Sequence, residues 1–225
     1  DNTCLEKELT CTDNFVSGEQ FDVFCCKECG FKFTQNFPLG PEIDRYYNST
    51  DYISHSDTHK GLVNNLYHRV RRQMLKRKTQ LVLTTSLLKT GKLLDVGTGT
   101  GYFPAAMRKK GWNVEAVEKN EQTRAYAKEK FNLDVYGESA LNTFEPQTFD
   151  VITLWHVMEH LEHLDEVWNK LHTLLKDTGF LIIAVPNCAS YDAEYYKEQW
   201  AAYDVPRHLW HFTPATIQKW GAKHG

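Results

Sequence analysis

The sequence lacks the features that mark membrane and secreted proteins. No apolar run reaches the ~20 residues that a membrane-spanning helix needs, and the N-terminus shows no secretion-signal pattern. An excess of charge of one sign is also absent, because a formal net charge of −3 over 225 residues gives no general attraction to nucleic acid or membranes. We therefore expect a cytoplasmic protein with one large core, no membrane partner and no nucleic acid as its main ligand.

Cysteine is almost absent beyond residue 50, since five of the six cysteines lie in residues 1–50. Without a secretion signal, this number favours reduced thiols or metal ligands over a disulfide framework. Cys26-Lys-Glu-Cys29-Gly30 has the spacing of a zinc knuckle, in which the glycine lets backbone amides approach the sulfurs. Cys4 and Cys11 are the upstream candidates for two further ligands, although their spacing is wider than usual. A zinc site and reduced structural thiols both remain open.

The most informative stretch is Lys92-Leu-Leu-Asp-Val-Gly-Thr-Gly-Thr-Gly101. Its apolar residues predict a buried parallel strand, and its three glycines predict a tight turn in which backbone can touch a ligand. A helix over 102–110, stopped by Gly111, would complete the first βα unit of a doubly wound sheet. The ligand of such a sheet lies beyond the carboxyl end of this strand.

The spacing of the glycines indicates which ligand binds. A dinucleotide fingerprint needs G-x-G-x-x-G, and Tyr102 stands where its third glycine would be. S-adenosylmethionine (SAM) has no pyrophosphate and leaves room for that side chain, and Asp95 suits its ammonium group. A second strand over 113–118 ends in Glu118, whose carboxylate can accept two hydrogen bonds from a ribose diol. Because Glu118 suits NAD equally well, an NAD-dependent oxidoreductase is an alternative.

Two further blocks accompany the glycine turn. Residues 149–160 and 179–187 follow it in the order of a fourth and a fifth strand. Together the three blocks resemble the class I SAM-dependent methyltransferases, in particular their ubiquinone-biosynthesis-like branch, over about residues 91–212. The resemblance implies an α/β, Rossmann-like, doubly wound and mostly parallel sheet with helices on both faces. It also implies a SAM-dependent methyltransferase that acts on a small-molecule acceptor, with O-methylation favoured over C- or N-methylation.

The resemblance also implies a set of cofactor contacts around the carboxyl ends of the strands. Glu138 is expected near the adenine amino group, with an ordinary turn as the alternative. The expected contacts are Asp95, Gly97, Thr98, Gly99, Gly101, Tyr102, Phe103, Glu118, Lys119, Glu138, Ser139, Trp155 and His156.

Methyl transfer is an in-line displacement that needs orientation and removal of a proton from the acceptor. Histidine is the natural base near neutral pH, and His156 directly follows the fourth strand. His208 and His211 lie in an aromatic and basic segment and are candidates to face the substrate, or else to pin this segment by hydrogen bonds. In the resembling branch a Glu-x-x-Glu-His cluster can hold a divalent cation. Here His156 replaces its first glutamate, which favours a capping or packing role for Glu159 and His160.

The chain divides by composition into three regions: a cysteine-containing segment over 1–50, a basic amphipathic helical region over 51–90, and a SAM-binding domain over 91–225. Residues 60–91 carry eight Lys or Arg and no Asp or Glu. This charge indicates either a solvated helix face or a patch for an anionic substrate. A further alternative is a non-catalytic module in which the cysteine segment and the basic helix bind zinc and nucleic acid.

The remaining elements follow the pattern of alternating strands and helices. We predict a helix capped by Asn120 and running to Lys130, a short third strand over 133–136, a helix over 164–175, and a last helix beginning at Thr213-Pro214. Methyltransferase sheets of this class normally add an antiparallel edge hairpin after that helix. No residues remain here to build it, so we expect the chain to continue beyond Gly225 and an upstream cysteine knuckle to precede Asp1.

Overall fold

The computed structural model describes residues 4–47 and 62–224, which form two compact units. The parallel-sheet unit holds residues 62–157 and 165–184, and the antiparallel-sheet unit holds residues 4–47, 158–164 and 185–224. This division differs from the expected regions 1–50, 51–90 and 91–225, because residues 185–224 fold with the N-terminal strands. The expected boundary near residue 50 lies outside the described residues. No helix in the described ranges is both long and apolar enough to cross a membrane.

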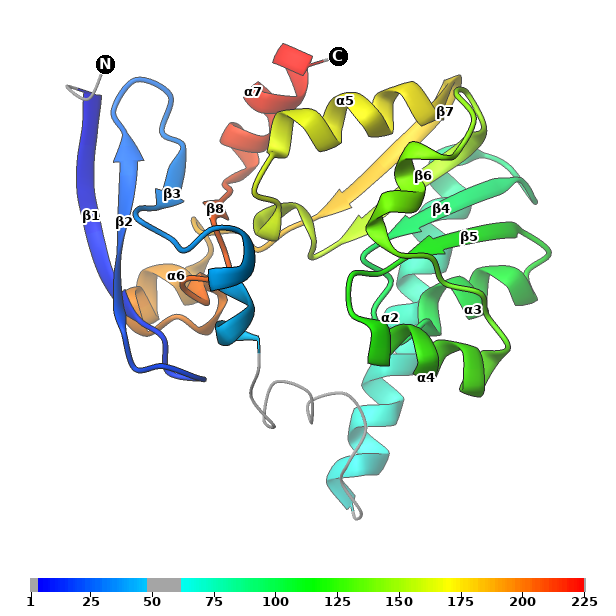
Figure 1. Ribbon diagram of the computed structural model, residues 1–225, viewed down its shortest axis with the longest axis horizontal. Coiled ribbons are helices and arrows are strands. Elements are labelled where there is room, and N and C mark those ends of the chain that lie inside the picture. The colour runs from blue at the N-terminus through cyan, green and yellow to red at the C-terminus, as the bar shows by residue number, and fades with distance from the viewer. Residues whose placement is uncertain (1–3, 48–61, 225) are drawn as a thin grey trace. The chain divides into compact units, whose positions relative to one another are not determined.

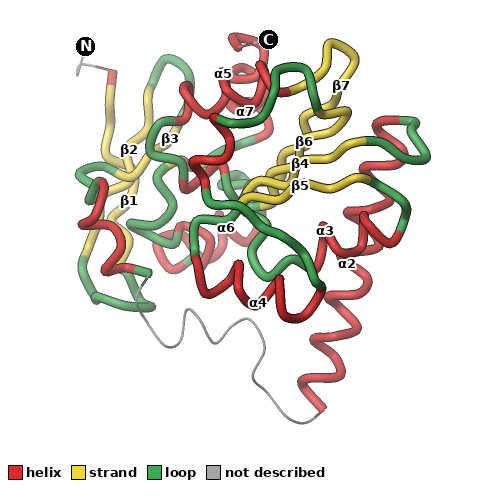
Figure 2. The backbone as a smooth tube through the Cα atoms, turned by 45° about the vertical axis from the view of Figure 1, so that its right-hand side comes forward, coloured by secondary structure: helices red, strands yellow, loops and turns green. Residues whose placement is uncertain are grey.

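The parallel-sheet unit contains four parallel strands in the order β5-β4-β6-β7 (Figures 1 and 2). The strands are β4 (Lys92–Val96), β5 (Asn113–Val117), β6 (Phe149–Trp155) and β7 (Leu175–Ala184). The register places Asp95 of β4 between Ala116 of β5 and Thr153 of β6. This Rossmann-like α/β sheet confirms the expected fold class.

Four helices accompany this sheet: α2 (Leu62–Ser86), α3 (Tyr102–Lys109), α4 (Glu121–Phe131) and α5 (Leu164–Leu174). The connections β4-α3-β5 and β6-α5-β7 run in opposite directions across the sheet. Right-handed crossovers in opposite directions place α3 and α5 on opposite faces. On the α3 face, Val82 of α2 packs in one core with Phe103, Met107 and Val151.

Several predicted boundaries are confirmed, and others shift. Asn120 caps α4 by accepting a hydrogen bond from the Thr123 amide, at 2.9 Å. The predicted strand over 133–136 is reduced to a single parallel bridge between Tyr136 and Val117. The fifth strand begins at Leu175 instead of Gly179, directly after α5 ends at Leu174. Of the helical region expected over 51–90, the structure describes a helix over Leu62–Ser86, and residues 51–61 lie outside the described residues.

The antiparallel-sheet unit has the strand order β1-β2-β3-β8. Its strands are β1 (Leu5–Thr12), β2 (Gln20–Cys26), β3 (Lys32–Thr34) and β8 (Trp210–His211). The segment around β8 joins this sheet because Trp210 and His211 pair with Phe33 and Lys32. Short helices complete the unit: η2 (Gly40–Tyr46), η4 (Met158–His160), α6 (Tyr191–Tyr196), η5 (Lys197–Gln199), η6 (Ala201–Tyr203) and α7 (Pro214–His224).

Candidate functional site

The glycine turn after β4 combines tight packing with an opening. All three glycines have positive φ, at +66° for Gly97, +55° for Gly99 and +80° for Gly101, a conformation that glycine adopts readily. A Cβ at Gly97 would lie 2.4 Å from a Val157 methyl, and one at Gly101 would lie 2.9 Å from the Ala127 Cβ. A Cβ at Gly99 would meet nothing within 4 Å. The first and third glycines therefore permit packing, and the second borders space in which a ligand can approach backbone.

Glu118 follows β5 and lies against this turn. Its carboxylate accepts hydrogen bonds from the Gly99 amide at 2.8 Å and from the Asn120 amide at 2.9 Å. A carboxylate offers about four lone-pair sites, so two remain for further donors such as a pair of hydroxyls. The structure thus brings Glu118 to the glycine turn, as a diol-binding role requires.

Asp95 is a buried carboxyl at the carboxyl end of β4, with 1% of its surface exposed. It accepts hydrogen bonds from the hydroxyls of Thr98 and Thr153, each at 2.6 Å. Burial raises the pKa of Asp95 to about 6, although the two hydroxyls and the charge of Lys78 favour its ionised form. Sequence reasoning missed Thr153, whose signal is a hydroxyl between the apolar residues Ile152 and Leu154.

Trp155, at the end of β6, has an aromatic ring that contacts the ammonium group of a lysine. Its ring packs edge-on against Phe103, with centroids 5.3 Å apart. The Lys78 ammonium of α2 lies 4.7 Å from the Trp155 ring centroid, a cation–π distance. Burial lowers the pKa of Lys78, and Asp95 opposes this effect. The sequence showed Lys78 only as one member of a basic run.

The other basic residues of that run differ from Lys78. Arg69, Arg72, Lys76 and Arg77 of α2 are exposed. Their exposure is compatible with both alternatives from the sequence, a solvated helix face and a patch that contacts an anionic substrate.

Several expected cofactor contacts point to protein neighbours. The Tyr102 hydroxyl accepts a hydrogen bond from the Lys130 ammonium at 2.6 Å, and the Arg71 guanidinium lies 4.2 Å from the Tyr102 ring centroid. Phe103 is buried in the core beside Trp155. Lys119, Glu138 and Ser139 are exposed. For Tyr102 and Phe103, the backbone at the start of α3 is therefore the part that borders the glycine turn.

His156 follows β6 in the parallel-sheet unit and has an exposed imidazole. Its φ is +61°, and its amide donates a hydrogen bond to the Ala184 carbonyl at 2.8 Å. A residue other than glycine in this left-handed region is uncommon and is held there by its surroundings. Its exposure makes the ring accessible to a small molecule from solvent.

His208 and His211 belong to the antiparallel-sheet unit and are buried. The His208 Nδ1 lies 2.8 Å from the Ala202 carbonyl oxygen, and the His211 Nε2 lies 3.0 Å from the Thr34 hydroxyl. Burial lowers the pKa of His211 to about 3. These contacts are those of histidines that pin the segment before α7, which was the alternative to a substrate-facing role.

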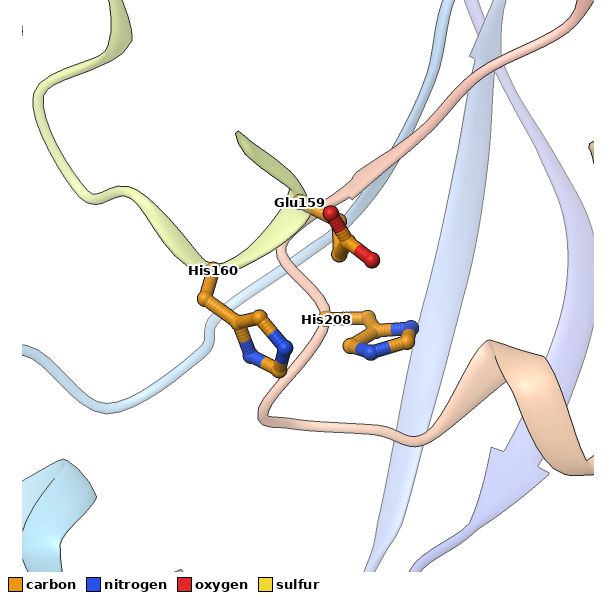
Figure 3. Close-up of side chains that lie close together, drawn as sticks. All are labelled: Glu159, His160 and His208. Carbon is orange, nitrogen blue, oxygen red and sulfur yellow. The ribbon is translucent and has the colours of Figure 1, made fainter. Parts of the chain in front are cut away.

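Glu159 and His160 belong to η4, and Figure 3 shows them together with His208. The His160 Nδ1 lies 2.9 Å from the Arg207 carbonyl oxygen and 3.2 Å from the Tyr47 hydroxyl. Burial lowers the pKa of His160 to about 4, and the neighbouring His208 adds to this effect. The sequence showed no relation between residue 208 and residues 159–160, because only the tertiary fold brings them together.

The knuckle cysteines gather without Cys11. The sulfurs of Cys4 and Cys26 are 3.9 Å apart, and the backbone amides of Cys29 and Glu28 lower the pKa of the Cys26 thiol. The Gly30 amide closes the turn by donating to the Cys26 carbonyl at 2.7 Å. Zinc binding by Cys4, Cys26 and Cys29 stays a prediction.

Cys11 does not join the expected fourfold set. It lies seven residues after Cys4 along an extended strand, which corresponds to about 23 Å. Its side chain is 1% exposed and packs with Val23, Cys188 and Val205. Burial raises the pKa of Cys11 to about 12. It is therefore placed as a core thiol.

Comparisons with known proteins agree with this geometry. A family model described as a methyltransferase domain matches residues 67–225, more than half of the chain. An uncharacterized methyltransferase of Staphylococcus carnosus is 32% identical over 117 residues, which cover 50% of this chain and 54% of that protein. The mitochondrial ubiquinone biosynthesis O-methyltransferase of Schizosaccharomyces pombe is 30% identical over 101 residues, which cover 41% of this chain and 37% of that protein.

Solved structures show the same fold. The crystal structure of a SAM dependent methyltransferase from Archaeoglobus fulgidus has a TM-score of 0.57 and 23% identity, and the match covers 70% of this chain and 68% of that one. The matches to the two curated relatives span about half of their length or less.

Proposed function

The chain belongs to the methyltransferase domain family, and from this premise we propose that it transfers a methyl group from SAM to an oxygen atom of a small-molecule acceptor. The observation that carries this proposal is the meeting of Gly99 and Glu118 at the carboxyl ends of β4 and β5. Backbone there is open to a ligand, and a carboxylate with spare lone pairs lies beside it.

The residues present fit the parts of SAM. Glu118 can accept hydrogen bonds from the two ribose hydroxyls. Asp95 supplies negative charge, and the face of Trp155 can stabilise a cationic group. Lys78 already places an ammonium over that ring at 4.7 Å, which supports the view that this position accepts positive charge. When bound, SAM supplies an electrophilic methyl group.

The role of the protein in the reaction is orientation and proton removal. In-line displacement forms the bond between acceptor oxygen and methyl carbon while the bond between that carbon and sulfur breaks. The His156 imidazole is the proposed base that takes the proton from the acceptor hydroxyl, because it is exposed and directly follows β6. A positioned base contributes about 10²- to 10⁴-fold to the rate. SAM that has lost its methyl group is S-adenosylhomocysteine, the second product.

Oxygen is favoured as the acceptor atom because the relatives named ubiquinone biosynthesis O-methyltransferase share the matched region. The exposed basic residues of α2, which include Arg72 and Arg77, favour an acceptor that carries negative charge.

Isothermal titration with SAM and S-adenosylhomocysteine tests the proposal. Saturable binding of both is expected, and a folded chain that binds neither would end the proposal. Methyl transfer is then screened over phenols, carboxylic acids and amines. His156→Gln should lower kcat by about 100-fold with unchanged cofactor affinity, whereas the exposed His172→Gln of α5 serves as the matched control. Fluorescence titration with NADH tests the oxidoreductase alternative.

A further inference from the structure

We propose that Glu159, His160 and His208 form a binding site for a divalent transition-metal ion of the zinc type. One ligand atom from each residue lies within 4.8 Å of the others. Figure 3 shows the two imidazoles side by side with the carboxylate close to His208. A tetrahedral zinc ion with bonds of about 2.1 Å separates its ligand atoms by about 3.4 Å, so shifts of about 1 Å per side chain would complete the site.

The hydrogen bonds of the two histidines involve Nδ1 and leave Nε2 of each ring for a metal ion. The Nδ1 atoms of His160 and His208 lie 2.9 Å and 2.8 Å from the carbonyl oxygens of Arg207 and Ala202. A carbonyl oxygen only accepts, so each Nδ1 carries a proton, and in the neutral form of such a ring Nε2 has the free lone pair. A hydrogen bond from the second ring nitrogen to a carbonyl is the contact that orients metal-binding histidines.

The chemistry of the cluster selects the class of ion. Two imidazole nitrogens and one carboxylate suit zinc and related transition metals. Magnesium and calcium prefer sites made of oxygen atoms alone. Glu159 is 1% exposed, so its carboxyl group would meet an ion here with little competition from bulk water.

This site differs from both metal sites that the sequence suggested. It does not use the cysteines, which lie in another part of the antiparallel-sheet unit. It does not use His156, which stands at the first position of the Glu-x-x-Glu-His pattern but belongs to the other unit. His208 supplies the third ligand instead. A bound ion would link η4 to the segment before β8, and this role is independent of the proposed function.

Metal titration of the full chain tests the proposal. Since Cys26 and Cys29 can also bind zinc, the double variant Cys26→Ser, Cys29→Ser serves as the background. We expect this background to bind one equivalent of Zn²⁺ by isothermal titration after treatment with a chelator. Adding Glu159→Gln should raise the dissociation constant for Zn²⁺ by more than about 100-fold. Losing a metal ligand has a larger effect than losing a residue that only hydrogen-bonds to a ligand. His172→Gln should leave the dissociation constant unchanged.

Two further measurements keep the outcome decisive. His208→Gln removes a second ligand and should also weaken zinc binding. Glu159→Gln preserves the shape of its side chain, so it decides the question even if His208→Gln does not fold. Circular dichroism checks the fold of each variant. Zn²⁺ should raise the thermal midpoint of the background and not that of its Glu159→Gln derivative. The proposal is overturned if the Cys26→Ser, Cys29→Ser background binds no zinc, or if its Glu159→Gln derivative binds zinc as tightly as the background.

Discussion

Lowering the pH through 6 should weaken the binding of SAM, because Asp95 attracts the cationic groups of the cofactor only when it is ionised. Burial raises the pKa of Asp95 to about 6 in the folded chain. If binding requires the ionised form, the affinity follows the ionised fraction, which is about 0.9 at pH 7 and about 0.1 at pH 5. The expected loss of affinity between these two pH values is therefore about tenfold.

The same shift sets the energetic cost of the site. The pKa of Asp95 is higher in the folded chain than the ordinary value of 3.8, so its ionisation opposes folding. The stabilising effect of the neutral form is present below pH 3.8 and is lost as the pH rises through 6. The difference corresponds to about 3 kcal/mol as an upper estimate. A bound cation would offset part of this cost.

Isothermal titration with SAM at pH 5, 6 and 7 measures the effect. Asp95→Asn keeps the volume of the side chain and removes the charge, so it should bind SAM more weakly at pH 7 and lose the tenfold step. The reasoning would be refuted by a wild-type affinity that is constant from pH 7 to pH 5, or by an equal step in Asp95→Asn. Circular dichroism at each pH verifies that the chain remains folded.

Three further predictions concern other residues. Glu118→Gln should weaken SAM binding by about 1.5–3 kcal/mol, because it removes a charged acceptor; titration beside the exposed control Glu121→Gln checks this, and equal affinities would contradict it. Arg207 is fully buried and donates hydrogen bonds to Asp13 at 2.9 Å and to Asp204 at 2.6 Å. Arg207→Met should therefore lower the free energy of unfolding, measured in urea, by about 3–5 kcal/mol. A loss below about 1 kcal/mol would argue against this network. The pKa of His211 is lowered to about 3, below its ordinary 6.5, so its stabilising contribution is complete above pH 6.5 and is lost as the pH falls toward 3; His211→Gln should flatten the acid limb of the stability curve, and an unchanged limb would show that other groups cause it.

The glycine turn shows which features local sequence predicts well. β4 runs over Lys92–Val96 as expected, and α3 ends at Lys109, one residue before the predicted end. Gly111 has the positive φ expected of a residue that stops a helix. These features depend on contacts within a few residues, so periodicity and glycine position are enough to predict them.

Elements that depend on a distant partner were predicted less well. The strand expected over 133–136 is one bridge at Tyr136, because its extent is set by pairing with β5 and not by its own sequence. The positive φ of His156 could not be predicted from residue type alone, because few residues other than glycine adopt it, although histidine does so more often than most. The sequence did not distinguish Lys78 from the other seven basic residues of its region, because only the packing of α2 places its ammonium over Trp155.

The sequence by itself determined the alternating α/β order, the glycine turn after β4 and the acidic end of β5, because each is encoded by the spacing of nearby residues. Only the tertiary structure decided that Trp210 and His211 complete a sheet with the N-terminal strands, that Cys11 is a core thiol, and that His208 lies with Glu159 and His160. Contacts between residues far apart in the chain are selected by packing and strand pairing across the whole fold, and no short pattern of residues encodes them.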